Sequence, residues 1–348
     1  MESILSVDFS VPSLISPFKI RDKSMTKTIL SVSINKQKRP SLSINSLTGS
    51  YIYQWTSKKN HQHNLSLLNI SDVNFEETST YSIDNFSQYQ QEIYSDRLIP
   101  TSSYTYKYNN QDANKLKNHY FIKIHLESSG NILRTLANPL GFNKEVTDGN
   151  ISYFVNLWNK QMKFSQYLKT SIDYRHYWKI DQKNSIAIRT MGGIIYAYGN
   201  NDQAPFIKKF IAGGANDLRA WQSYEMPNGR VQPDSENIST LYTGGVKFIS
   251  CLEYRFNILK QLKGAVFSDA GNIWEIKSDV QDANFKWNKF IDDIAVNIGF
   301  GIRYDFQYFI LRSDVGFRLR EPYENKKWQW ENIKIPSAQF NFGLGYPF

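Results

Sequence analysis

The sequence predicts an all-β protein that crosses a membrane as an antiparallel β-barrel. Apolar residues alternate with small or polar ones over many segments, most of them near the ~10 residues of a tilted strand that spans a bilayer. No segment approaches the roughly 18 consecutive apolar residues of a transmembrane helix. The alternation is clearest over 294–306. One face of this segment holds Ile298, Phe300 and Ile302, and the other holds Asn297, Gly299 and Arg303. A strand with such different faces separates an apolar medium from a polar one.

The same period of two predicts about thirteen strands along the chain. In chain order, the predicted strands cover 5–11, 30–34, 51–55, 64–73, 104–108, 122–126, 168–178, 186–198, 246–256, 262–274, 294–306, 309–319 and 340–348. No segment has a convincing helical pattern, although 83–93 and 133–140 are expected to hold short turns.

The connections between these strands are uneven. Gln307 alone can separate the strand that ends near Phe306 from the next one, which predicts a tight turn. Long loops are expected at 75–96, 131–165, 199–240 and 321–337. Short turns on one side and long loops on the other are typical of outer-membrane barrels. A soluble sandwich or propeller also alternates, but the Gly, Asn and Ser of the polar faces and the aromatic residues near strand ends favour the barrel.

Composition excludes several classes of protein. The 348 residues are 41% hydrophobic and 15% aromatic, which excludes disorder for most of the chain. A single cysteine, Cys251, excludes an internal disulfide framework and a cysteine-based zinc site. The net charge is +9, but Lys and Arg are scattered through loops, so no nucleic-acid partner is expected. The N-terminus has no basic region before an apolar core, so it is not a secretory signal peptide.

Residues with catalytic or metal-binding chemistry form no recognisable constellation. His61 and His63 are interpreted as an exposed loop pair, and Asp292 with Asp293 as a solvated turn before a strand. The motifs of serine hydrolases, P-loop proteins, zinc proteases and dinucleotide-binding proteins are absent from the sequence. We therefore expect a protein that is not an enzyme and that has no cofactor and no metal site.

Two segments and the end of the chain carry more than strand patterning. Residues 206–221 read FIKKFIAGGANDLRAW, and 264–274 read GAVFSDAGNIW. The motif residues of the first segment are Gly213, Gly214, Leu218, Arg219, Ala220 and Trp221, and those of the second are Asp269 and Gly271. The last predicted strand alternates through Phe340, Phe342, Leu344, Tyr346 and Phe348.

Together these segments resemble the outer-membrane assembly-factor superfamily, the BamA/TamA family also known as bacterial surface antigen. In this family a long loop carries the motif GG-x-x-x-[LVM]-R-[GA]-[FYW] and folds back into the barrel. The next strand but one carries F-x-D-x-G, and the final strand ends in an aromatic residue. The stretches RAW, GFGIRYDFQYFILRSDVGFRLR and FGLGYPF look closest to the TamL-like branch, and FSVPSLISPF near the N-terminus looks like an inner TamL strand.

The resemblance implies roles for the motif residues. Arg219 is expected to point into the lumen and to pair with Asp269, which would hold the loop in place. The alternative for Arg219 is a solvated loop arginine. Gly213 and Gly214 would let the loop bend, and Trp221 would pack in the lumen or simply anchor the loop. Phe348 and the aromatic residues before it would form the C-terminal signal that barrel-inserting machinery reads, and Phe348 would also fit an aromatic girdle.

The resemblance also implies where this chain belongs in the family barrel. The family has sixteen strands, with the motif loop between the eleventh and the twelfth. Five predicted strands follow the loop in this chain and about eight precede it. Residues 1–348 are therefore expected to be a C-terminal barrel domain that begins at the fourth strand, without the POTRA domains and without a targeting signal. The expected barrel is open between 5–11 and 340–348.

The function that the resemblance implies is protein insertion or export at the outer membrane of a Gram-negative bacterium. A weakly paired seam between the first and last strands would accept strands of nascent outer-membrane or exported proteins. The implied partners are outer-membrane lipid, these client proteins and a TamB-like inner-membrane protein. A passive pore or a surface antigen is the alternative, and a soluble β-rich binding domain is disfavoured. The loop motif with Asp269 favours the assembly factor, because a simple pore does not need it.

Overall fold

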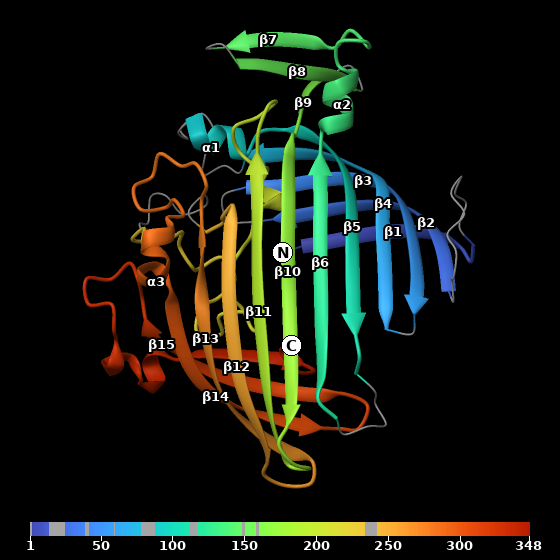
Figure 1. The fold of residues 1–348 in the computed structure, drawn as a ribbon. Helices are drawn as coiled ribbons and strands as arrows, with labels where there is room; N and C mark the ends of the chain where they lie inside the picture. Colours follow the sequence, from blue (N-terminus) through green and yellow to red (C-terminus); the bar gives the residue numbers. More distant parts are fainter. Residues whose placement is uncertain are drawn as a thin grey trace. The chain divides into compact units, whose positions relative to one another are not determined.

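The computed structural model describes residues 2–13, 25–38, 42–58, 60–77, 88–111, 117–147, 150–157, 160–233 and 242–348. Long antiparallel strands dominate these residues, so the predicted all-β class is confirmed (Figure 1). None of the helices in these ranges is long and apolar enough to span a membrane. Of the expected loops, 78–87 and 234–240 lie outside the described residues.

Thirteen strands follow one another in the main path of the sheet, and each overlaps a predicted strand. They are β1 (Glu2–Val11), β2 (Met25–Lys38), β3 (Leu42–Lys58), β4 (His61–Glu77), β5 (Arg97–Asn109), β6 (His119–Ser129), β10 (Tyr167–Lys179), β11 (Asn184–Ala197), β12 (Val246–Asn257), β13 (Leu262–Trp274), β14 (Ala295–Asp305), β15 (Ile310–Arg320) and β16 (Gln339–Leu344). The strand order is β1-β2-β3-β4-β5-β6-β10-β11-β12-β13-β14-β15-β16.

The path has two ends, β1 and β16. Within the described residues no strand pairing joins β1 to β16. β1 pairs with β2 from Glu2 to Val11, whereas β16 pairs with β15 over six residue pairs. β16 also ends at Leu344, earlier than the predicted 340–348.

Three further strands lie off the main path, in the segment 131–165 that was predicted to be a loop. They are β7 (Asn143–Thr147), β8 (Asn150–Leu157) and β9 (Lys160–Phe164). β8 pairs with β7 and β9, and β9 adds a short parallel pairing to β5. A small core of Leu98, Ala137, Tyr153 and Phe164 explains why this segment is ordered.

Short helices occupy the connections. α1 (Gln88–Ile93) and α2 (Asn131–Leu136) overlap the two segments that were expected to hold turns, although 83–87 lie outside the described residues. The others are η2 (Phe206–Lys208), η3 (Trp287–Lys289), α3 (Phe290–Asp293), η4 (Trp330–Asn332) and η5 (Ile335–Ser337). The predicted tight turn between β14 and β15 is also present, and Gln307 has a φ of 72° there.

The predicted faces of β14 are confirmed by burial. Phe300 and Ile302 are 53% and 49% exposed, whereas Asn297 and Arg303 are fully buried. Pairing continues this division across the sheet, because directly opposed residues project from the same face. Glu253, Phe267, Gly299 and Gly316 form one such cross-strand row from β12 to β15. We call the face that carries this row the polar face.

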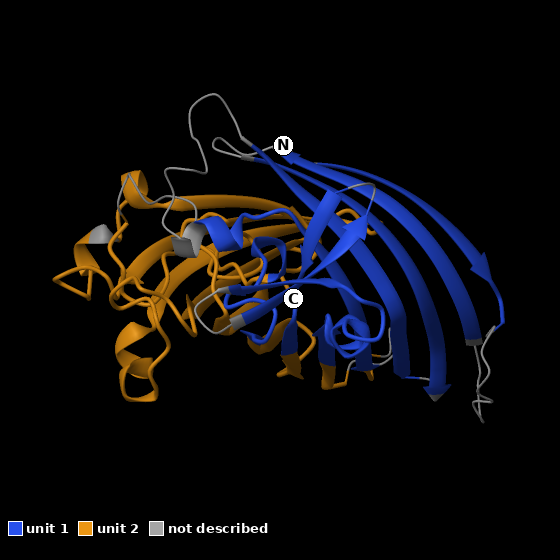
Figure 2. Ribbon diagram, turned by 90° about the horizontal axis from the view of Figure 1, so that it is seen from above, with its two compact units in different colours: residues 1–108, 123–170, 195–208 blue, residues 109–122, 171–194, 209–348 orange. Residues whose placement is uncertain are grey.

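The chain forms two compact units (Figure 2). The first comprises 1–108, 123–170 and 195–208, and the second comprises 109–122, 171–194 and 209–348. β12 to β16 and all motif residues, which begin in the loop at Gly213, belong to the second unit.

Candidate functional site

Arg219 lies at the centre of the site, fully buried against the polar face. Its Nε and Nη2 donate to the two carboxylate oxygens of Asp269 at 2.9 and 2.8 Å, which is a bidentate pair. The backbone N–H of Arg219 donates to the same carboxylate at 3.2 Å. One carboxylate of β13 therefore holds both the side chain and the backbone of the loop residue.

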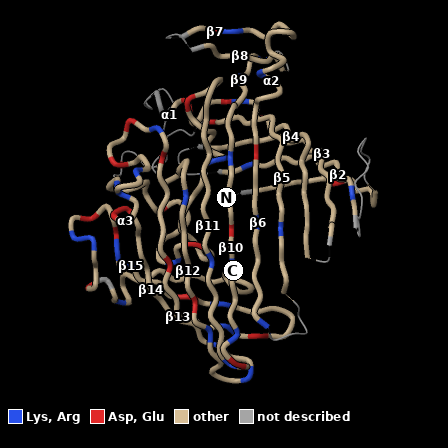
Figure 3. Tube along the Cα trace, in the orientation of Figure 1, with Lys and Arg blue, Asp and Glu red and all other residues tan. Residues whose placement is uncertain are grey.

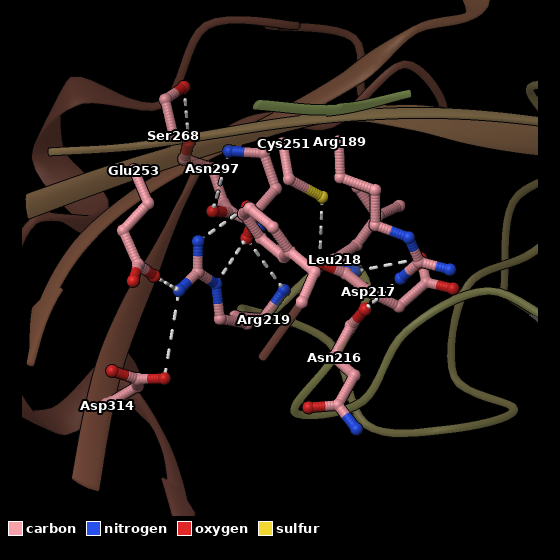
Figure 4. A network of polar contacts seen from close by, with 12 residues as sticks. Arg189, Asn216, Asp217, Leu218, Arg219, Cys251, Glu253, Ser268, Asn297 and Asp314 are labelled. Atoms are coloured by element: carbon pink, nitrogen blue, oxygen red, sulfur yellow. Dashed lines mark hydrogen bonds and ion pairs between the residues drawn. The ribbon is translucent and has the colours of Figure 1, made fainter. Parts of the chain in front are cut away.

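Two further carboxylates face the Arg219 guanidinium (Figure 4). Nη1 donates to Glu253 at 2.6 Å and lies 3.7 Å from Asp314. The guanidinium also lies over the Phe267 ring, 3.4 Å from its centroid, which adds a cation–π contact. Burial alone would lower the pKa of Arg219, but the charge and hydrogen bonds of Asp269 and the charges of Glu253 and Asp314 raise it above its ordinary value.

The carboxylates around Arg219 are shared with arginines of neighbouring strands. Arg303 donates to Glu253 at 3.0 Å and lies 2.8 Å from Asp314. Arg312 donates to Asp314 at 3.2 Å, and Arg255 donates to Glu253 at 2.7 Å. We call Arg219, Glu253, Asp269, Arg303 and Asp314 the Arg219 network. Every charge of this network is buried beside an opposite charge, which limits the cost of desolvation.

The two motif glycines close the loop on itself. Gly213 and Gly214 have φ values of 91° and 99°, a conformation that residues with a Cβ rarely adopt. The N–H of Gly214 donates to the backbone oxygen of Trp221 at 2.8 Å, and a Cβ at Gly213 would lie 2.2 Å from the backbone oxygen of Gln222. Residues 214–221 therefore form a closed turn. Leu218, Ala220 and Trp221 are all buried in it.

The loop approaches β15 and β16 at backbone distance. A Cβ at Gly316 would lie 2.9 Å from the backbone oxygen of Arg219, so only glycine gives the loop this room. Arg318 of β15 donates to the backbone oxygen of Ala220 at 3.0 Å. Asn341 of β16 donates to the backbone oxygen of Arg219 at 2.7 Å. The last two strands thus contact the same two loop residues, Arg219 and Ala220.

Trp221 is fully buried, and its indole Nε1 donates to the hydroxyl of Tyr323 at 3.4 Å. The guanidinium of Arg318 lies 5.4 Å from the centroid of its ring. Burial, followed by the charge of Glu321, raises the pKa of Tyr323 above its ordinary value, so this phenol stays a neutral donor and acceptor.

A second set of contacts, which no sequence motif indicates, holds the loop just before Arg219. Lys247 forms an ion pair with Asp217 and donates to the backbone oxygen of Ile211 at 2.6 Å. Arg189 and Arg312 donate to backbone oxygens of Asn216 and Ala215, at 2.6 and 2.8 Å. Backbone acceptors carry no residue-type signal, so the sequence could not reveal these partners.

The structure also places Gly271 and the aromatic chain end. Gly271 lies in β13 opposite Ile249, and the three atoms nearest to an added Cβ there belong to Phe248 and Ile249. The outward alternation of the last strand holds for Phe340, Phe342 and Leu344, which are 50%, 74% and 73% exposed. Gly345, with a φ of 80°, ends this alternation.

The expected continuation of the apolar face to Phe348 is wrong. Phe348 is buried, and its backbone oxygen accepts a hydrogen bond from Arg255 at 3.2 Å. The Arg255 guanidinium lies 4.3 Å from the centroid of the Tyr346 ring and 5.6 Å from that of Phe348. Tyr346 and Phe348 therefore turn toward a polar-face arginine instead of continuing the apolar face.

Two other interpretations need correction. Asp293 is 2% exposed rather than solvated; it accepts from the indole of Trp274 at 3.0 Å and lies 3.1 Å from Arg230. His61 and His63 lie in β4 rather than in a loop. Their Nδ1 atoms form hydrogen bonds with tyrosine hydroxyls, at 2.8 and 2.7 Å.

Comparison with known protein families finds a match over almost the whole chain. Residues 6–348 match the family model described as the Omp85 superfamily domain. Among solved structures, BamA from Haemophilus ducreyi lacking POTRA domains 1-3 is 11% identical, with a TM-score of 0.40 over 99% of this chain and 69% of that chain. CdiB from Acinetobacter baumannii is 13% identical, with a TM-score of 0.38 over 99% of this chain and 59% of that one. With a family match that covers nearly its whole length, the chain belongs to the Omp85 superfamily.

Proposed function

We propose that this chain is the membrane-embedded β domain of a factor that inserts or exports proteins at the outer membrane of a Gram-negative bacterium. Membership of the Omp85 superfamily supports this proposal. The described strands alternate between apolar and polar faces over lengths that suit a bilayer. Such a function needs an edge that can accept a strand and a scaffold that holds this edge, and it needs no catalytic group.

The observation that carries the proposal is that β16 is an edge strand. This strand is the last in the path of the sheet and is paired on one side only within the described residues. It is short, and its outward residues Phe340, Phe342 and Leu344 are strongly exposed. An edge strand with free backbone groups is a template for another strand. A client strand would add to β16 by backbone hydrogen bonds, with its apolar side chains in lipid beside Phe342.

The motif loop would serve as the scaffold for this edge. Asp269 and Glu253 hold Arg219 on the polar face, and the backbone of Arg219 accepts from Asn341 of β16. We therefore propose that the motif residues act together as a loop lock that sets the position of the last strand. Its members are Gly213, Gly214, Leu218, Arg219, Ala220, Trp221 and Asp269.

More specifically, we propose that the chain belongs to the TamL-like branch. This proposal rests on the sequences of the motif loop and of the last two strands. It adds a TamB-like inner-membrane protein as partner, and outer-membrane lipid and client proteins as the other contacts. In this form, Phe340, Phe342 and Leu344 form the apolar part of the C-terminal signal. Tyr346 and Phe348 instead pack on Arg255.

Depletion of the protein in its own cell separates assembly from passive transport. We expect the amounts of folded outer-membrane or exported proteins to fall, as measured by quantitative mass spectrometry of the outer membrane and by heat-modifiable gel mobility. A plasmid copy with the intact loop should restore them, and one with Arg219→Ala should not. If depletion changes only permeability to small solutes and leaves the membrane proteome intact, the chain is a passive pore and the proposal is wrong.

A further inference from the structure

A cavity of about 570 Å³ lies in the second unit, at the end of the strands where β10 turns into β11 and β12 turns into β13. Its volume is in the range of ligand-binding pockets. Five of its lining residues are cationic, and Lys and Arg can be followed at this end of the strands in Figure 3. They are Arg175, Lys179, Lys183, Arg255 and Lys263. No aspartate or glutamate is among the described residues that line the cavity.

Three of these cations have carboxylate partners that do not themselves line the cavity. Arg175 pairs with Asp173, Arg255 with Glu253 and Lys263 with Asp305. Lys179 and Lys183 differ, since neither forms an ion pair within the described part of the chain. Asp181 in the same turn is occupied by the backbone N–H groups of Lys183 and Asn184 and by the Asn184 amide. Asp181 interacts electrostatically with Lys183, but the lining still carries an excess of positive charge that attracts anions.

The end of the chain forms part of the cavity wall. Tyr346 and Phe348 line it, and both rings lie against the Arg255 guanidinium, which also donates to the backbone oxygen of Phe348. Tyr177, another lining residue, stacks on His119 with 4.3 Å between ring centroids. Aromatic rings beside cations suit a peptide that combines acidic and aromatic side chains.

The composition of the wall distinguishes a peptide from a single phosphate. The cations come from three strands and one turn around a space much larger than one phosphate group. The lining also includes the side-chain amides of Gln182 and Asn257, and amides can pair with peptide N–H and C=O groups. An extended chain with several carboxylates uses all of these groups, whereas one phosphate uses few.

We propose that this cavity binds an acidic polypeptide segment that also carries aromatic residues. The inference rests on the proposed function and deepens it, because the segment would belong to the client or partner protein. Lys179 and Lys183 bind its carboxylates, and Tyr177 and Tyr346 pack against its rings. Arg255 also donates to Glu253, so this arginine connects the cavity to the Arg219 network.

Calorimetric titration of the whole folded chain in vesicles of zwitterionic phosphatidylcholine tests the proposal. The probes are a short peptide that alternates Glu and Tyr, its counterpart that alternates Gln and Tyr, and inorganic phosphate. We expect binding of the Glu–Tyr peptide only, weakened by salt. Lys179→Glu with Lys183→Glu should weaken it about tenfold. Lys286→Glu, which reverses an exposed lysine of the same unit outside the cavity, should leave binding unchanged.

Three results would overturn the proposal. These are equal binding of the Gln–Tyr peptide, unchanged binding by the double variant, and equal losses in the double variant and in Lys286→Glu. Preferential binding of inorganic phosphate would instead identify an anion site and also contradict a peptide site. Client insertion is measured on the same vesicles. Insertion without peptide binding refutes the cavity proposal alone, and peptide binding without insertion supports the cavity and refutes the proposed function.

Discussion

The side-chain amide of Asn341 donates a hydrogen bond to the backbone oxygen of Arg219, with 2.7 Å between the two atoms. Asn341 belongs to β16, at the end of the sheet, whereas the guanidinium of Arg219 binds Glu253 of β12 and Asp269 of β13. One loop residue therefore links the edge strand to strands in the interior of the sheet. Substitutions in the loop are therefore expected to alter the position of β16 through this residue.

Arg219→Ala and Asp269→Ala should each destabilise the folded protein by about 3–5 kcal/mol, because each leaves a buried charge without its partner. The double variant should be little worse than either single variant, since the pair acts as a unit. Urea unfolding in detergent micelles measures all three. Arg219→Lys is a useful control, because it keeps the charge and loses the bidentate geometry. Additive losses in the double variant would contradict the proposed lock.

Gly316→Ala should lower the free energy of unfolding by about 1–3 kcal/mol, because the new Cβ would press on the backbone of Arg219 and Ala220. It should also make the loop more sensitive to protease. Gly49→Ala is the matched control, since Gly49 lies in a strand and a Cβ there meets nothing within 4 Å. If both variants lose the same stability, the glycine at 316 is not needed for close approach of the loop.

Phe300→Arg should lower the free energy of unfolding by ~2–4 kcal/mol, because the introduced guanidinium would lie at the lipid midplane. The same change at Tyr304, near the end of the same strand, should cost roughly 0–1 kcal/mol. Refolding into vesicles of defined thickness measures both. Equal costs at the two positions would show that the outward face of β14 does not lie in a bilayer.

Asp293 gives a pH prediction for a group outside the strands. Burial raises the pKa of Asp293 above its ordinary 3.8, against the hydrogen bond from Trp274 and the charge of Arg230. The folded state then holds this proton more tightly than the unfolded state does. The free energy of unfolding should therefore fall as pH rises from about 3.8 through the raised value. Asp293→Asn should remove this fall, and Asp292→Asn, at an exposed neighbour, should retain it. A pH profile that Asp293→Asn leaves unchanged would contradict the assignment.

The strands of the main path were predictable because alternation is a local property of the sequence. The tight turn at Gln307 and the faces of β14 follow from the same period. β7 to β9 were missed since they are short and pair chiefly with one another. Their order depends on a core that includes Leu98, which lies far away in sequence.

The candidate site was predictable only in part. The motif identified Arg219 and Asp269, but Glu253, Arg303 and Asp314 have no motif and meet only through the register of β12 to β15. Phe348 was misplaced because the alternation of the last strand continues in sequence beyond Leu344. The positive φ of Gly345 ends the alternation, and the hydrophobic pattern does not indicate this φ.

The central claim is that β16 is an edge that accepts a client strand, and site-specific photocrosslinking in the cell tests it most directly. A photoreactive phenylalanine analogue would replace Phe342 on β16 or, as the control, Phe300 on β14, which is also exposed on the apolar face. We predict crosslinks from position 342 to newly made outer-membrane or exported proteins, lost in Arg219→Ala, and lipid crosslinks alone from position 300. Client crosslinks of equal yield at both positions, or none at position 342, would contradict the claim.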